Sequence, residues 1–300
     1  MKKVLKKERQ LIKSYWISLI ADFRYWLLRK ERQKFRICDS EQTINYILEN
    51  RCSVSRYGDG ELYLMTGNEN GFQSYSARLA ERLRDILQVE QKNHIACIPY
   101  YLKNIVALNK EARLFWEEHS IKYLKTWQTI INSDKIYYDA AITRFYIDYK
   151  DKRRSAKSIS LLKRLWEGRD ICIIEGEQTR LGVGNDLFCN SKSITRILCP
   201  SKNAFRKYDE ILMRAKMLSS DNLILIALGM TATVLAYDLS RFGFQAIDVG
   251  HVDVEYEWMK MGAEQKVALP NKYVNEVVNG ETNTVLKDKG YLDQVVARVI

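Results

Sequence analysis

Hydrophobic and polar residues alternate along most of the chain in blocks typical of short strands and short helices. Runs rich in apolar residues and bounded by polar turns occur at 52–55, 94–99, 170–175, 193–199, 222–228 and 244–249. Between them, apolar residues recur at helical spacing over 40–50, 75–89, 104–131, 155–166, 203–218 and 231–242. Apolar strands separated by helices are typical of a parallel sheet that is covered on both faces. The pattern therefore predicts an α/β protein: a single Rossmann-like domain with a mostly parallel sheet.

The composition fits one large globular domain. The 300 residues are 46% hydrophobic and 28% charged and include only 3 prolines, so the chain can bury a sizeable core. None of the six cysteines forms a Cys-x-x-Cys pair, and most lie in apolar runs. We interpret them as small buried side chains in a reducing compartment, which argues against a structural zinc site.

The positive charge is concentrated at the N-terminus. Residues 1–36 hold twelve Lys or Arg and three acids, a net of +9, which leaves +2 of the total +11 for the remaining chain. Apolar and aromatic residues within 12–27 recur at helical spacing, with Trp16 and Trp26 among them. The segment 1–36 is therefore predicted to be a basic amphipathic helical arm, and 37–300 the catalytic domain.

Two interpretations of this arm remain open. It either lies on an anionic membrane surface or packs on the body of the protein or on another subunit of a homo-oligomer. Its longest uncharged run, 14–21, is far too short to span a bilayer. We expect a cytoplasmic protein, peripheral on the inner face of the membrane if the first interpretation holds. A nucleic-acid partner is disfavoured, because the body carries only +2 and has no recognisable module.

The sequence Arg56-Tyr57-Gly58-Asp59-Gly60-Glu61 follows the first predicted strand. Ligands of such sheets bind outside the carboxyl ends of the strands, so this loop lies where chemistry is expected. Asp59 and Glu61 can converge on one hard cation, Mg²⁺ or Mn²⁺, while Gly58 permits close approach of a ligand and Arg56 can bind phosphate. The alternative is a solvated turn in which Asp59 caps the next helix.

Two further loops carry candidate nucleotide-binding residues. After the strand at 170–175, Arg180 and the backbone at Gly184 can cradle a diphosphate, and Glu177 can bind a sugar hydroxyl. Equally, the arginine pairs with a nearby glutamate and the loop is structural. After the strand at 193–199, Lys202 and Asn203 lie at the start of a helix, where an anion can bind.

The loop after the strand at 244–249 carries His251, Asp253 and Glu255. If this segment is helical, His251 and Glu255 share a face, as do Asp253 and Glu257, and either pair can supply a general base. If it is extended, His251, Asp253 and Glu255 share one side and can together bind a metal. A lone histidine is nevertheless more often structural than catalytic.

In combination these motifs resemble the GT-D-type glycosyltransferases. The resemblance rests on RYGDGE, on ITR at 142–144, on EGEQTRLGVGNDLF, on CPSKNAFRKYDEIL, on LGMTATVLAYDL and on GFQAIDVGHVDVEYEW, in that order over 56–261. It implies a single Rossmann-like domain that uses a UDP-sugar donor and a divalent metal held by an Asp-x-Glu motif, here Asp59 and Glu61. Met230 departs from the proline expected after LG, and the arm lies outside the resemblance.

The implied activity is transfer of a hexose, typically glucose, from a UDP-sugar to a glycan, glycoprotein or lipid-linked acceptor in cell-surface polysaccharide or glycoprotein assembly. Mn²⁺ or Mg²⁺ would be the cofactor, and Glu255, Asp253 and His251, in that order, are the expected bases. Two alternatives remain open: a metal-dependent phosphohydrolase with Glu175 and Glu177 around a second ion, and a non-catalytic, membrane-docked subunit of a glycan assembly complex.

Overall fold

The computed structural model describes residues 22–69, 71–278, 280 and 288–300. Its strands are β1 (Ser53–Arg56), β2 (His94–Ile98), β3 (Tyr138–Asp139), β4 (Asp170–Gly176), β5 (Ser193–Cys199), β6 (Leu223–Ala227), β7 (Gln245–Asp248) and β8 (Val295–Arg298). Its α-helices are α2 (Arg29–Arg32), α3 (Ser40–Asn50), α4 (Asp59–Met65), α5 (Ala77–Gln88), α6 (Lys110–Ile130), α7 (Arg154–Lys163), α8 (Tyr208–Ala215), α9 (Met230–Arg241), α10 (Val252–Met261) and α11 (Lys289–Asp293). Short 3₁₀ turns are η1 (Tyr100–Leu102), η2 (Ala140–Thr143) and η3 (Ala204–Lys207).

The eight strands form one sheet in the order β3-β2-β1-β7-β6-β4-β5-β8, and every pairing is parallel. The central strands are buried on both faces, as in β6, where all five residues are buried. This confirms the predicted α/β class and the parallel sheet. The short β3 and β8 at the two edges were not predicted, because a two-residue strand and a four-residue strand with one buried residue leave little pattern in the sequence.

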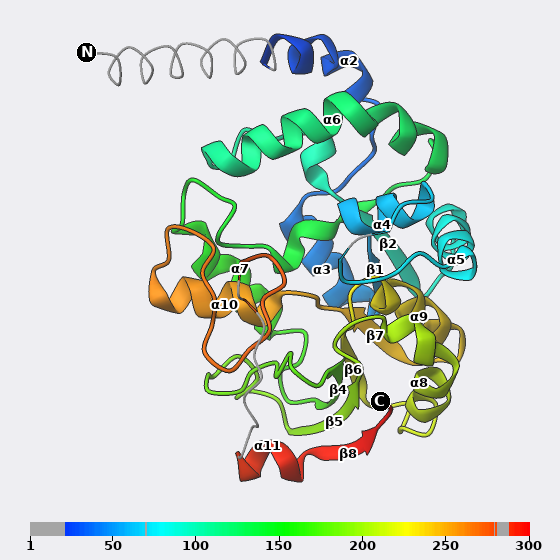
Figure 1. The fold of residues 1–300 in the computed structure, drawn as a ribbon, viewed down its shortest axis with the longest axis vertical. Helices are drawn as coiled ribbons and strands as arrows, with labels where there is room; N and C mark the ends of the chain where they lie inside the picture. Colours follow the sequence, from blue (N-terminus) through cyan, green and yellow to red (C-terminus); the bar gives the residue numbers. More distant parts are fainter. Residues whose placement is uncertain (1–21, 70, 279, 281–287) are drawn as a thin grey trace.

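Helices cover the sheet on both faces (Figure 1). One hydrophobic core includes residues of α4, α5, α6, α8 and α9, and a second core, on the opposite face, includes residues of α3, α7 and α10. The chain leaves β1 toward α4 on the first face and leaves β7 toward α10 on the second. Because β1 and β7 are neighbours, paired at Val54 and Ile247, the crevice at their carboxyl ends lies at the topological switch point of the sheet.

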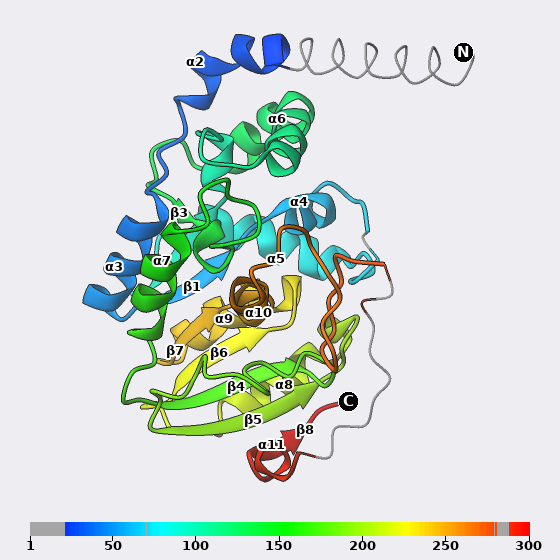
Figure 2. The ribbon, with the colours of Figure 1, turned by 90° about the vertical axis from the view of Figure 1, so that its left-hand side faces the viewer.

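The predicted N-terminal arm lies largely outside the described residues. In its described part, Tyr25 is buried, whereas Phe23, Trp26 and Leu27 are each more than half exposed. Asp22 forms an ion pair with Arg113 of α6, so this part of the arm packs along α6 (Figure 2). Among the described helices, none is both long enough and apolar enough to cross a membrane. Membrane association of residues 1–36 stays a prediction.

Candidate active site

One cavity of about 590 Å³ opens at the carboxyl edge of the sheet. Its walls come from the segments that follow β1, β2, β3, β4, β6 and β7, from the first turns of α6, and from the segment 264–276 after α10. In Figure 2 this last segment, drawn in orange, lies over the carboxyl edge of the strands. The cavity thus occupies the position that the topology assigns to a ligand.

Arg56 joins three segments of the cavity wall. Its Nε donates to the Asp248 carbonyl oxygen at 2.8 Å, its Nη2 donates to Asp248 Oδ1 at 2.9 Å, and its Nη1 donates to Thr143 Oγ1 at 2.6 Å. Gly250, with φ of +43°, lies so close that a Cβ there would be 1.9 Å from Nη2. The predicted phosphate-binding arginine therefore uses most of its N–H groups to hold the end of β7 against η2.

The Asp-Gly-Glu sequence forms the first turn of α4. Gly58 is the residue before the helix, and its N–H donates to Glu61 Oε2 at 2.7 Å. Glu61, and not Asp59, therefore makes the capping hydrogen bond at the start of the helix. Asp59 lines the cavity and is partly exposed, and no hydrogen bond or ion pair to its carboxylate is found within the described part of the chain. Burial, together with the negative charges of Asp248 and Asp59, raises the pKa of Glu61 to about 7.

A divalent cation held by two carboxylates would fit this donor set. Nowhere in the described ranges do three or more His, Cys, Asp or Glu side chains form a group that could hold an ion. Mg²⁺ characteristically takes one or two carboxylates and completes its coordination with waters and substrate phosphates. The burial of Glu61, which raises its pKa to about 7, and the Asp59 carboxylate on the cavity wall are the observations that favour a cation here.

The segment after β7 is helical from Val252, which decides between the two conformations considered above. His251, Asp253 and Glu255 therefore do not line up on one side as three ligands of a metal. Asp253 and Glu257 do share a face: Lys272 Nζ lies 2.7 Å from Asp253 Oδ2 and 3.0 Å from Glu257 Oε1. Asp253 lines the cavity but is neutralised by this buried lysine.

Glu255 does not occupy the position expected of a base. Its side chain is fully buried, is not among the residues that line the cavity, and accepts the N–H groups of Tyr146 and Ile147 at 2.9 and 3.0 Å through Oε2. Burial raises the pKa of Glu255 to about 7. Glu255 therefore holds the chain after η2 in place and does not face the cavity. This corrects the prediction that Glu255 is the first candidate for the base.

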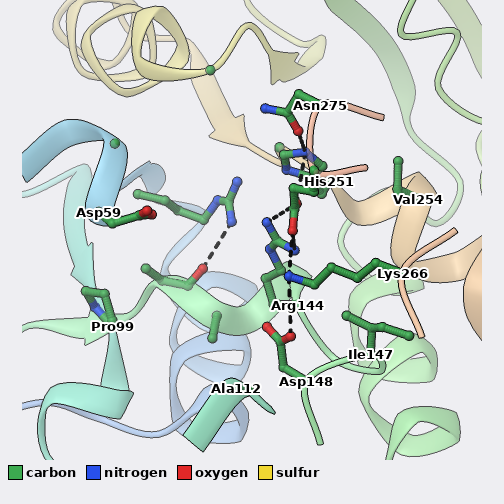
Figure 3. A pocket seen from close by; sticks show the side chains of 18 of the residues that line it. Asp59, Pro99, Ala112, Arg144, Ile147, Asp148, His251, Val254, Lys266 and Asn275 are labelled. Atoms are coloured by element: carbon green, nitrogen blue, oxygen red, sulfur yellow. Dashed lines mark hydrogen bonds and ion pairs between the residues drawn. The ribbon is translucent and has the colours of Figure 1, made fainter. Parts of the chain in front are cut away.

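His251 faces the cavity directly before α10. Its Nε2 lies 2.7 Å from Asn275 Oδ1 and 3.3 Å from Glu276 Oε1 (Figure 3). Burial and the nearby charge of Arg144 lower the pKa of His251 to about 4, so the ring is neutral at neutral pH. With Nε2–H donating to Asn275, the other ring nitrogen, Nδ1, is left as an acceptor.

A charged cluster around Arg144 borders the same side of the cavity. Arg144 binds Glu276 through both terminal nitrogens, one of them at 2.9 Å, and lies 3.7 Å from Glu255 Oε1. Lys266 Nζ lies 2.8 Å from Glu276 Oε2 and 3.8 Å from Asp148 Oδ1. The sequence offered one signal for this cluster, the ITR motif, but Glu276 and Lys266 lie in a segment without a strand or helix pattern.

The predicted nucleotide-binding residues of the other two loops lie behind the cavity wall. None of Glu177, Arg180, Gly184, Lys202 and Asn203 is among the residues that line it. Arg180 is buried and donates to the Asn271 carbonyl oxygen at 2.7 Å, and Asn203 Oδ1 accepts the Ser74 N–H at 2.7 Å. Both side chains therefore hold neighbouring loops together. Other residues of these loops line the cavity.

The cavity-lining residues of these loops include a stacked aromatic pair. Phe72 and Tyr273 lie with ring centroids 6.2 Å apart and planes 14° from parallel, and Lys202 Nζ lies 5.9 Å from the Tyr273 ring. Phe72 packs on Gly229, the residue before α9, where a Cβ would be 2.3 Å from the ring. Gly229, Thr179 and Leu181 also line the cavity, so this corner combines aromatic faces with the N-terminus of a helix.

Comparison with known proteins agrees with this architecture. The family model described as "Glycosyltransferase GT-D fold" matches residues 54–277. A solved structure described as "The highly conserved domain of unknown function 1792 has a distinct glycosyltransferase fold" superposes with a TM-score of 0.87 at 42% identity, covering 91% of this chain and 99% of the other. A second, described as "A New Glycosyltransferase (DUF1792) from Streptococcus sanguinis", gives 0.84 at 37% identity over 89% of this chain and all of the other.

Curated relatives carry the same assignment. "Glycosyltransferase GlyD" of Streptococcus pneumoniae serotype 4 is 36% identical over 91% of this chain, and "Probable glycosyl transferase Gly" of Streptococcus gordonii is 36% identical over the same share. The chain spans only 34% and 40% of the length of these two proteins. With the fold and the match over 54–277, the chain belongs to the family of glycosyltransferases with the GT-D fold.

Proposed function

We propose that this protein transfers a hexose, glucose in the first instance, from a UDP-sugar to a glycan, glycoprotein or lipid-linked acceptor in the assembly of a cell-surface polysaccharide or glycoprotein. The observation that carries the proposal is the pair Asp59 and Glu61 at the end of β1, on a cavity at the switch point of the sheet. Membership of the family supports the reaction class.

Asp59 and Glu61 would hold Mn²⁺ or Mg²⁺ together with the donor diphosphate. Bound there, such an ion offsets the negative charge that develops on the departing UDP. The chain's own contribution to the donor site is the corner at Gly229. The first N–H groups of α9 face an anion there, and the stacked rings of Phe72 and Tyr273 offer a surface for a nucleobase.

His251 is the base that the geometry favours for an inverting transfer. Of the three expected bases, only His251 and Asp253 line the cavity, and Asp253 is paired with Lys272. A neutral imidazole whose Nδ1 is an acceptor can take the proton of an acceptor hydroxyl. Glu276, with Oε1 3.3 Å from Nε2, would stabilise the imidazolium that results.

Product analysis tests the function against its two alternatives. The purified protein is incubated with UDP-, GDP- and TDP-sugars, with and without Mn²⁺, and the nucleotide products are separated. A glycosyltransferase is expected to release UDP from a UDP-hexose in a metal-dependent reaction that an acceptor accelerates. Inorganic phosphate or UMP would instead identify a phosphohydrolase. Absence of both turnover and nucleotide binding would favour a non-catalytic subunit.

A further inference from the structure

The two ends of the cavity differ in charge. Among the described residues, the lysine, arginine and histidine side chains that line the cavity are Arg56, Arg144, His251 and Lys266. They belong, in that order, to β1, to the residue after η2, to the segment between β7 and α10, and to the segment 264–276. The wall formed by η1 and α6 contributes no cation to the lining. In Figure 3, Pro99 and Ala112 mark this wall, and Asp148, Lys266 and Arg144 lie between Ala112 and His251.

The wall without cations is aromatic. Phe115 and Trp116 of α6, Tyr101 of η1 and Tyr63 of α4 all line the cavity. Trp116 is buried, with its ring centroid 5.1 Å from that of Tyr101 and 5.4 Å from that of Phe115. Phe115, by contrast, is 44% exposed although it faces the cavity. The wall therefore presents the exposed ring of Phe115, which the buried rings of Trp116 and Tyr101 support.

The position of this wall is fixed by contacts at the start of α6. Asn109 Oδ1 accepts the Ala112 N–H at 2.9 Å and caps the helix, while Asn109 Nδ2 donates to the Ile147 carbonyl oxygen at 2.8 Å. The helix start is thereby tied to the segment that follows Arg144. Glu111 is the only ionisable side chain that α6 adds to the lining, at the exposed end of the wall.

We infer that this wall is the acceptor subsite and that it takes a neutral pyranose ring. The inference rests on the proposed function, which places the charged nucleotide at the α9 corner and at Asp59 and Glu61. Aromatic faces suit the apolar C–H face of a sugar, and the exposed carboxylate of Glu111 at the margin suits its hydroxyls. Without a cation, and with Asp59 and Glu111 nearby, the wall disfavours an anionic sugar.

The test measures binding of simple glycosides by saturation-transfer NMR, which requires no donor and no turnover. The probes are methyl β-D-glucopyranoside, methyl β-D-galactopyranoside and the anionic methyl β-D-glucuronide. The variant Phe115→Leu removes the ring and keeps apolar bulk at a half-exposed position, and Phe115→Tyr keeps the ring. Phe242→Leu is the matched control, because Phe242 is 51% exposed at the end of α9 and does not line the cavity.

We expect at least one neutral glycoside to bind the wild type, Phe115→Tyr and Phe242→Leu alike, and to bind Phe115→Leu about five- to tenfold more weakly. The glucuronide is expected to bind more weakly than the neutral probes. The inference is overturned if no neutral glycoside binds the wild type, if Phe115→Leu binds as tightly as the wild type, or if the glucuronide binds best.

A separate thermal-shift measurement of the wild type with UDP-glucose, other nucleotide sugars and Mn²⁺ distinguishes failure of the proposed function from failure of the acceptor subsite. No stabilisation by any nucleotide sugar would defeat the proposed function. Stabilisation by UDP-glucose combined with failure of every neutral glycoside to bind would defeat the acceptor subsite alone.

Discussion

On one side of the cavity the chemistry comes from a single short turn between β1 and α4, whereas on the other side it comes from three segments far apart in the sequence. Asp59 and Glu61 are two residues apart and are placed by one helix start. Arg144, His251 and Glu276 meet through long-range contacts. The first side is set by local geometry, and the second depends on tertiary packing of the segment 264–276. The two sides should therefore respond differently to substitution.

The largest effect is expected on the β1–α4 side. Asp59→Asn and Glu61→Gln remove the negative charge while keeping the size, so metal-dependent UDP release should fall by about two orders of magnitude or more. Folding should be retained by Asp59→Asn, because no partner of Asp59 is lost within the described structure. Asp221→Asn, at an exposed position, is the control. Activity of Asp59→Asn within threefold of wild type would refute its role.

On the other side the first expected effect is on stability. Arg144→Gln leaves the buried Glu255 without its cation and Glu276 paired with Lys266 alone, which should lower the free energy of unfolding by about 2 kcal/mol in urea titrations. The control is Arg153→Gln, whose solvent-exposed pair with Asp151 should contribute little to the free energy of unfolding. Equal effects of the two substitutions would contradict a packed charge cluster.

Two residues of this cluster, Glu255 and His251, should change the free energy of unfolding with pH in opposite directions. The folded-state pKa of Glu255 is raised to about 7, so between pH 4.5 and 7 the unfolded chain releases the proton that the folded chain keeps. Stability of the wild type relative to Glu255→Gln should therefore fall as pH rises through this window, by about 3 kcal/mol.

His251 should act in the other direction. Its folded-state pKa is lowered to about 4, so the unfolded chain gains a proton below pH 6.5 that the folded chain does not accept until about pH 4. Relative to His251→Gln, the wild type should lose about 3 kcal/mol as pH falls from 6.5 to 4. Urea unfolding of both variants at four pH values measures the signs, and two slopes of the same sign would contradict these assignments.

The smallest effect is expected behind the cavity wall. Gly184 has φ of +79° with open space around its Cβ position, so Gly184→Ala should cost about 1 kcal/mol of backbone strain. Because Gly184 does not line the cavity, UDP release should stay within twofold of wild type. A large loss of activity without a loss of stability would restore its predicted role as a phosphate ligand.

Sequence patterns predicted well those features that depend on neighbouring residues. The all-parallel sheet followed from apolar runs alternating with amphipathic helices, and the place of Asp59 and Glu61 followed from the glycine-bracketed turn after β1. Features that depend on tertiary contacts were not accessible. The role of Glu255 depends on the backbone N–H groups of Tyr146 and Ile147, and that of Arg56 on Asp248.

The central claim is that Asp59 and Glu61 hold a divalent cation, and binding of Mn²⁺ itself tests it most directly. Free Mn²⁺ is measured by electron paramagnetic resonance during titration of the wild type, Asp59→Asn, Glu61→Gln and the control Asp221→Asn, each with UDP present. We predict saturable binding by the wild type and the control, and binding at least tenfold weaker in both site variants. Equal Mn²⁺ affinity of all four proteins would contradict the account.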